Sequence, residues 1–190
     1  MTNNNQNLDQ LRDEVLKKLG RNLYNFQQIE KILKHLISNC SVSGNISNLE
    51  KIKDKKTKAT MSLNMGVLVG QLIDNIYITK DQVEEWSNRP VNEKPLNETR
   101  VSFNFNIETT AEFIKQRKSE LKSLVNERNH LVHHLFTDKN IHSFDDLVEV
   151  EQYLDNQRIR VIKEYSNLLE IVKVFESMSK EMLQNAKAGE

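Results

Sequence analysis

The chain has few of the residues that break secondary structure and almost none that can crosslink it. Its 190 residues include five glycines, two prolines and a single cysteine, Cys40. One cysteine excludes an intramolecular disulfide, so a reducing compartment is favoured and we expect a cytoplasmic protein. Because glycine and proline are scarce, the secondary-structure elements should be long.

An excess of charge of either sign is also missing, since 27 basic residues balance 27 acidic ones. Proteins that bind nucleic acid over a broad surface carry a basic excess, so the composition does not favour that class. It leaves room for an enzyme that meets RNA at one small site. Any contact with RNA would then depend on a local group of cationic side chains.

Long apolar runs are absent as well. The most apolar stretch, residues 61–78, is interrupted by Asn64, Gln71 and Asp74, whereas a membrane-spanning helix needs about 20 apolar residues. Residues 1–10 are polar and rich in asparagine, without the basic and apolar regions of a signal peptide. We therefore expect no membrane segment and no secretory leader.

The sequence does contain helical periodicity over most of its length. Apolar residues recur at steps of three and four, which predicts amphipathic helices. The predicted helices cover residues 8–37, 60–75, 110–135 and 143–183. Thr109 or Thr110 can cap the third helix, and Ser143 can cap the fourth.

One segment has the alternation of a strand instead. Val101, Phe103, Phe105 and Ile107 are separated by single polar residues, which predicts a half-buried strand. The only nearby partner that the sequence offers is the apolar segment 76–78. We expect residues 79–100 to be irregular.

Together these patterns predict an all-α fold, a bundle of about four long helices with a small β ribbon or irregular excursion around residues 76–107. Residues 1–190 should form a single helical domain. Its N-terminal helical hairpin covers residues 8–75, and its C-terminal helical hairpin covers residues 108–183. Five lysines between residues 51 and 58 could form either a solvated helix face, which we favour, or an edge that binds phosphate.

The strongest chemical signal is Arg128-Asn129-His130-Leu131-Val132-His133-His134, within the third predicted helix. A guanidinium binds phosphate as a bidentate fork, and an imidazole can move a proton near neutral pH. Cleavage of RNA by transesterification needs no metal if a cation stabilises the phosphorane and an imidazole transfers protons. Arg128 and His133 could supply these two groups.

The position of Arg128 raises a question about its partner. On a straight helix Arg128 lies in the middle of the apolar stripe, where a charge needs an opposite charge or a wet cleft. His133 then lies about 140° from Arg128, and His134 about 120° away on the other side. Either the helix distorts near His133 or the site is completed across a dimer interface. Alternatively, Arg128 pairs with a core carboxylate and the histidines have no chemical role.

The motif resembles that of the HEPN superfamily of metal-independent ribonucleases, in which an arginine is followed, after four to six residues, by a histidine. Arg128 and His133 match the four-residue spacing, and His134 gives the five-residue alternative. The resemblance implies a homodimeric bundle of about four helices that cleaves RNA by attack of the 2′-hydroxyl on the adjacent phosphate. It assigns Arg128 to the phosphate, His133 or His134 to proton transfer, and the polar Asn129 to orientation.

The resemblance also implies a setting. Members of the superfamily occur in toxin–antitoxin pairs and in antiviral defence, so an antitoxin or defence-system partner is expected beside the RNA substrate. In one toxin branch a tyrosine stands two residues after the motif histidine. This chain has Leu135 there, so the resemblance does not extend to control through that tyrosine.

Two other functions remain open. A non-catalytic helical protein could use the same bundle for dimerisation or for binding a partner. His130, His133, His134 and His142 could bind a metal, but no cysteine or carboxylate motif supplies the remaining ligands, so we expect neither a metal nor a cofactor.

Overall fold

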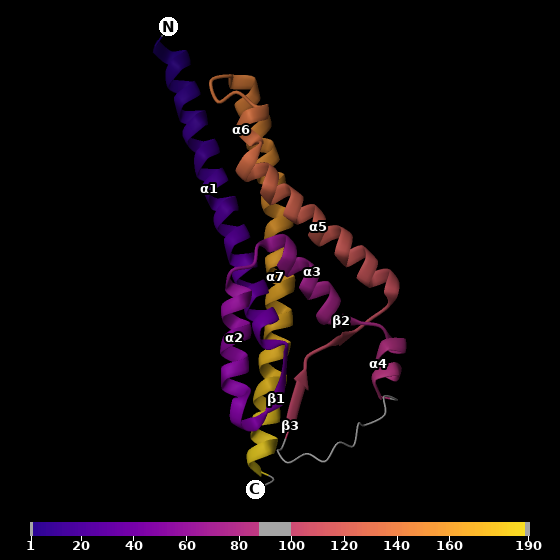
Figure 1. The fold of residues 1–190 in the computed structure, drawn as a ribbon. Coiled ribbons are helices and arrows are strands. Elements are labelled where there is room, and N and C mark those ends of the chain that lie inside the picture. Colours follow the sequence, from indigo (N-terminus) through magenta and orange to yellow (C-terminus); the bar gives the residue numbers. More distant parts are fainter. Residues whose placement is uncertain (1, 88–99, 189–190) are drawn as a thin grey trace. The chain divides into compact units, whose positions relative to one another are not determined.

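A computed structural model of the chain describes residues 2–87 and 100–188 (Figure 1). This part is mostly helical, with seven α-helices, one short 3-10 helix (η1) and four short strands. In chain order the elements are α1 Thr2–Asn39, β1 Ser41–Asn45, η1 Ile46–Asn48, α2 Leu49–Met61, α3 Met65–Asn75, β2 Tyr77–Ile78, α4 Lys80–Ser87, β3 Arg100–Asn104, β4 Ile107–Glu108, α5 Ala111–His133, α6 Leu135–Asp138 and α7 Phe144–Ala188. None of these helices is long and apolar enough to cross a membrane.

The chain divides into two compact units, and the three longest helices contribute to both. The first unit contains Met1–Ile29 and Ser123–Leu169, and the second contains Glu30–Lys122 and Glu170–Glu190. The candidate motif at residues 128–134 lies entirely within the first unit.

The first unit is built from the N-terminal part of α1, the end of α5, α6 and the first part of α7. Its buried apolar side chains recur at helical spacing along these helices, as the sequence pattern predicts. They are Val15, Phe26, Ile29, Leu124, Leu131, Leu135, Leu147, Val150, Leu154, Val161 and Leu168.

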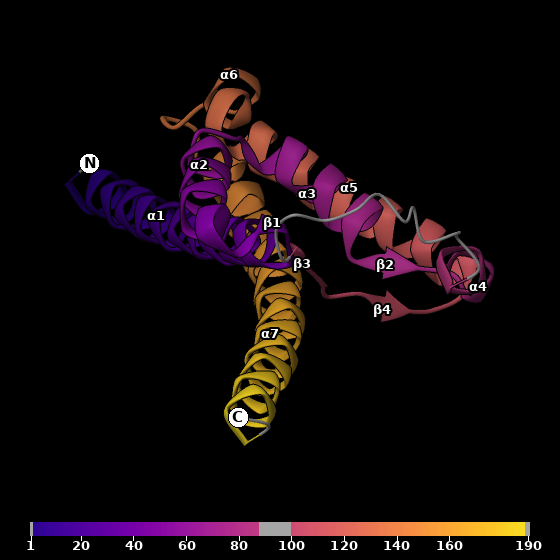
Figure 2. The ribbon, with the colours of Figure 1, turned by 60° about the horizontal axis from the view of Figure 1, so that its bottom comes forward.

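The second unit contains both small sheets. Strand β1 pairs with β3 in antiparallel register from Ser41 opposite Asn104 to Asn45 opposite Arg100. Strand β2 pairs with β4 in parallel, and Figure 2 shows these two strands side by side. The apolar core of this unit lies mainly on α1 and α3, where Leu33, Leu36, Leu68, Leu72 and Ile76 are fully buried.

Several sequence predictions are confirmed. Thr110 caps α5, since its hydroxyl accepts a hydrogen bond from the Phe113 amide at 3.2 Å. Ser143 caps α7 in the same way, accepting from the Asp146 amide at 3.4 Å. The long helices at residues 8–37 and 143–183 are present as parts of α1 and α7.

The β segment differs from the prediction in two respects. Ile107 does lie opposite Tyr77, as expected, but residues 101–104 pair with β1 rather than with residues 76–78. Residues 80–87, predicted to be irregular, form helix α4; the rest of that irregular segment, residues 88–99, lies outside the described residues. The predicted helix at 60–75 begins five residues later, because Asn64 caps α3 by accepting from the Val67 amide at 3.1 Å.

The lysine cluster lies on α2. Four of its side chains, Lys51, Lys53, Lys55 and Lys58, are exposed, as a solvated helix face requires. The fifth, Lys56, is only partly exposed and forms hydrogen bonds within the second unit.

Candidate functional site

The candidate motif occupies the last two turns of α5. The buried stripe of this helix follows steps of three and four through Leu121, Leu124, Leu131 and Leu135. Arg128 continues the stripe between Leu124 and Leu131, and its side chain is partly exposed. The structure therefore places a guanidinium within an apolar stripe, as the sequence predicts.

The partners of Arg128 distinguish it from a structural arginine. Its Nη1 donates one hydrogen bond, to Oδ1 of the adjacent Asn129 at 3.3 Å. Within residues 2–87 and 100–188, no carboxylate lies within ion-pair distance of Arg128. The neighbouring Glu127 is instead held by Arg160, which donates from Nε and Nη2 at 3.0 Å each. The alternative in which Arg128 pairs with a core carboxylate is therefore not seen in the described part.

His133 and His134 mark the end of α5. Both side chains are exposed, and their ring centroids lie 6.2 Å apart. His134 has φ −124° and ψ −24°, outside helical values, although its amide still bonds to the carbonyl of His130 at 2.9 Å. The helix therefore breaks beside His133, earlier than the predicted end near residue 135 and where one of the two alternatives places a distortion.

Among the described residues, the helix break does not bring Arg128 into a hydrogen bond with His133 or His134 of the same chain. No hydrogen bond in the described part connects Arg128 with His133 or His134, and only Asn129 contacts the guanidinium. Both histidines are free to meet a substrate or another copy of the chain. Of the two geometric alternatives drawn from the sequence, helix distortion alone does not complete the site.

His130 has a better-defined environment than either motif histidine. Its Nε2 lies 3.3 Å from Oδ2 of Asp138 on α6, and its ring contacts the Tyr153 ring edge-on at 5.6 Å. Its Nδ1 is buried and, within the described residues, has no hydrogen-bond partner. The Asp138 carboxylate orients the imidazole ring of His130.

No local pattern in the sequence indicates this pair. His130 and Asp138 are eight positions apart and would lie more than two turns apart on a continuous helix. They meet because the chain breaks at His134 and re-enters a helix at Leu135. From the sequence alone, His130 is a candidate only for metal binding.

A buried polar network lies behind His130. Gln157 Nε2 donates to the Tyr153 hydroxyl at 3.0 Å, and Gln157 Oε1 accepts from Asn22 Nδ2 at 3.1 Å. Asn22 Nδ2 also donates to the carbonyl of Leu154 at 2.8 Å. Burial, together with the Glu127 carboxylate, raises the pKa of Tyr153, so its hydroxyl stays protonated at neutral pH.

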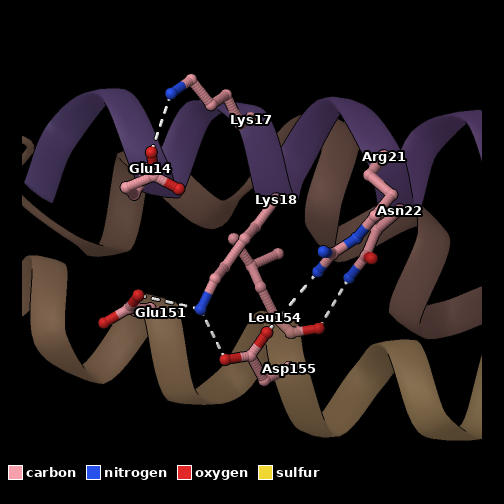
Figure 3. A network of polar contacts seen from close by, with 8 residues as sticks. All are labelled: Glu14, Lys17, Lys18, Arg21, Asn22, Glu151, Leu154 and Asp155. Carbon is pink, nitrogen blue, oxygen red and sulfur yellow. Dashed lines mark hydrogen bonds and ion pairs between the residues drawn. The ribbon is translucent and has the colours of Figure 1, made fainter.

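Figure 3 shows several charged groups of the first unit that are already paired with one another. Lys18 on α1 donates to Asp155 at 2.6 Å and to Glu151 at 2.8 Å, both on α7. These hydrogen bonds raise the pKa of Lys18, and the bond from Lys18 lowers the pKa of Asp155. Arg21 lies 3.5 Å from the same Asp155 carboxylate. These cations hold α1 against α7 and are not available to bind phosphate.

The four histidines considered as metal ligands do not form a metal site. In the part of the chain that the structure describes, no group of three or more histidine, cysteine or acidic side chains could hold a metal ion. His142 contacts Asn140 only through its backbone amide.

No protein-family model matches the sequence, and neither a curated protein nor a solved structure matches it. The chemistry of the site must therefore be argued from its own residues.

Proposed function

We propose that the chain is a metal-independent endoribonuclease of the HEPN type, which acts as a homodimer with the helical bundle of that superfamily. The observation that carries the proposal is the state of Arg128, a partly exposed guanidinium in an apolar stripe without a carboxylate partner in the described residues. A charge in such a place is stabilised by an anion. The phosphate of RNA is an anion whose geometry matches the guanidinium fork.

The chemistry requires no group beyond the side chains present. A neutral imidazole of His133 or His134 takes the proton of the 2′-hydroxyl as its oxygen forms a bond to phosphorus. Arg128 stabilises the charge that develops on the phosphorane oxygens. The bond from phosphorus to the 5′-oxygen breaks, and a protonated imidazole gives that oxygen a proton. The products are a 2′,3′-cyclic phosphate and a 5′-hydroxyl.

His130 and Asn129 have supporting roles in this proposal. Asn129 accepts from the guanidinium and limits its rotation. Asp138 lies 3.3 Å from His130 and orients that imidazole beside the motif. The resemblance further implies a toxin–antitoxin or antiviral setting, with an antitoxin or defence-system protein as partner.

The test is cleavage of single-stranded RNA in EDTA by the purified chain and its variants. We expect Arg128→Ala and His133→Ala each to reduce the rate by at least about 100-fold, the scale of a lost electrostatic or acid–base contribution. Arg158→Ala and His142→Ala are matched controls, because both side chains are exposed. These two substitutions should leave the cleavage rate unchanged. End-group analysis should find 2′,3′-cyclic phosphate.

Two results would contradict the proposal. One is cleavage that survives Arg128→Ala, and the other is cleavage that EDTA abolishes. A marked loss of thermal stability in Arg128→Ala with no change in cleavage would instead assign Arg128 a structural role.

A second candidate function is a non-catalytic protein that dimerises or binds a partner. Exposed apolar side chains in the first unit favour it, including Tyr24 at 59%, Phe144 at 52% and Ile159 at 70% exposure. Exposed side chains of this kind are available for contact with another protein. A stable dimer that cleaves no RNA, with or without divalent metal, would favour this candidate.

A further inference from the structure

A pocket in the second unit has the composition of a ligand site, and the ribonuclease proposal does not use it. It has a volume of about 370 Å³ and lies between α2, α3 and the segment that joins α1 to β1. Its lining combines apolar side chains with one cation and several neutral polar groups. The lining residues are Ile37, Cys40, Ser41, Lys56, Ala59, Thr60, Leu63, Gln71 and Asn75.

Lys56 supplies the only charge among these residues. Its ammonium donates to the carbonyl of Ser41 at 2.7 Å and to the Ser41 hydroxyl at 2.9 Å, and Cys40 Sγ lies 4.0 Å away. Within the described ranges, no carboxylate lies within ion-pair distance of this ammonium. Neutral acceptors therefore fix the cation in place, and no carboxylate of the described residues balances its charge, which favours an anionic ligand.

Two amide side chains on α3 add hydrogen-bond donors to the same pocket. Gln71 and Asn75 are four residues apart and so share one face of the helix. Asn75 accepts a hydrogen bond only through its backbone carbonyl, from Asn106 Nδ2. In the part of the chain described, neither amide side chain has a hydrogen-bond partner. Each can donate two hydrogen bonds to a ligand oxygen.

We propose that this pocket binds a small monocarboxylate with an apolar body. One ammonium balances one carboxylate, and the amides of Gln71 and Asn75 can donate to its oxygens. Ile37, Ala59 and Leu63 provide apolar walls for the remainder of the ligand. A phosphate ester fits less well, because it carries nearly two negative charges and the pocket supplies one cation and no arginine fork. The volume lies near the lower limit of about 300 Å³ for ligand pockets, which restricts the ligand to a small molecule.

The probes are benzoate, phenylacetate and isovalerate, with benzamide as the neutral counterpart of benzoate and phenyl phosphate as the dianion. Each is titrated into the ¹⁵N-labelled full chain while the side-chain amide signals are followed. We expect saturable shifts of the Gln71 and Asn75 amides with at least one carboxylate, at a Kd of about 1 mM or tighter. Benzamide and phenyl phosphate should bind at least about 10-fold more weakly than that carboxylate.

Two variants test the residues separately. Lys56→Met removes the cation, and Gln71→Leu removes one amide while leaving the contacts of Lys56 with Ser41 intact. We expect each to weaken carboxylate binding, Lys56→Met by at least about 10-fold. Lys58→Met is the matched control, because Lys58 is exposed on α2 and lies outside the pocket.

Three results would overturn the proposal. They are the absence of saturable shifts with all three carboxylates, equal binding by wild type and Lys56→Met, and tighter binding of phenyl phosphate than of any carboxylate. If Lys56→Met does not fold, Gln71→Leu still tests the proposal. Unchanged carboxylate binding by Gln71→Leu would also overturn the proposal. The outcome is independent of Arg128 and of RNA cleavage, since Lys56 lies in the other unit.

Discussion

Arg128 differs from the other arginines of the first unit in how its charge is compensated. Arg12 contacts Asp9, Arg21 contacts Asp155, and Arg160 forms a two-pronged pair with Glu127. Arg158 has no ion-pair partner among the described residues but is exposed, so water compensates its charge. Arg128 is both partly shielded from water and, within the described residues, without a carboxylate, which makes it the best-placed cation of this unit for an external anion.

The buried amides of Asn22 and Gln157 allow a test of stability at single residues. Both side chains are fully buried, and Gln157 Oε1 accepts from Asn22 Nδ2 at 3.1 Å. Gln157→Leu leaves a buried N–H of Asn22 without its acceptor and the Tyr153 hydroxyl without its donor. We expect the free energy of unfolding in urea to fall by about 1–3 kcal/mol.

The double variant separates the hydrogen bond from the rest of the packing. With Asn22→Leu and Gln157→Leu together, neither amide is stranded, so the combined loss should be smaller than the sum of the single losses by about 0.5–3 kcal/mol. Gln152→Leu on the exposed side of α7 is the control and should have little effect. Strictly additive losses would show that the two amides are energetically independent.

At the scale of elements, the ion pairs between α1 and α7 give the first unit a pH dependence with a definite sign. Lys18 lowers the pKa of Asp155 below its usual value of 3.8. A carboxyl with a lowered pKa in the folded state stabilises the protein above the unfolded pKa, and this contribution disappears as the pH falls through the folded value. The same contact raises the pKa of Lys18, so its contribution disappears only as the pH rises through that raised value, above 10.5.

Asp155→Asn should therefore lower the stability of the folded chain at neutral pH but not in strong acid. The expected loss at pH 7 is below about 1 kcal/mol, because the Asp155 carboxylate is half exposed to solvent. It should shrink to zero as the pH is lowered below the usual pKa of 3.8 and through the lowered folded value. Urea unfolding at a series of pH values measures it, with the exposed Asp54→Asn as control. A loss that is the same at every pH would contradict the ion-pair origin.

The long helices α1, α5 and α7 were predictable because their signals are local. The Thr110 and Ser143 caps and the apolar steps of three and four follow from neighbouring residues. Strand β1 was missed because its sequence, SVSGN, has one large apolar residue and its partner β3 lies more than 50 residues later. A pairing that distant leaves no trace in local periodicity.

The candidate site, like the fold, was predictable from the sequence only in part. The sequence identified Arg128 and the end of α5, because both follow from the apolar stripe. It could not identify the pairing of His130 with Asp138, which depends on the backbone angles at a single residue, His134. It also could not show that Lys56, alone among five lysines, turns toward Ser41.

At the scale of the whole molecule, the proposed ribonuclease requires Arg128 and His133 to act on one phosphate. No hydrogen bond of the described residues joins them within a chain; Arg128 is partly exposed and His133 is exposed. A homodimer solves this if the arginine of one protomer meets the histidine of its partner. Two-fold symmetry would then create two identical sites, each with one residue from each protomer.

Mixing two inactive variants distinguishes a shared site from one within a single chain. In a mixed dimer, one protomer carries Arg128→Ala and the other carries His133→Ala. One shared site then combines the intact His133 of the Arg128→Ala protomer with the intact Arg128 of the His133→Ala protomer. The other site lacks both groups. After subunit exchange of equal amounts, half of the dimers are mixed and each has one of two sites, so about one quarter of wild-type activity should return. Each variant alone, and a mixture prevented from exchanging, should stay inactive. If exchange is verified by light scattering and differential labels and no activity returns, the shared site is excluded, because a site within one chain is damaged in both variants.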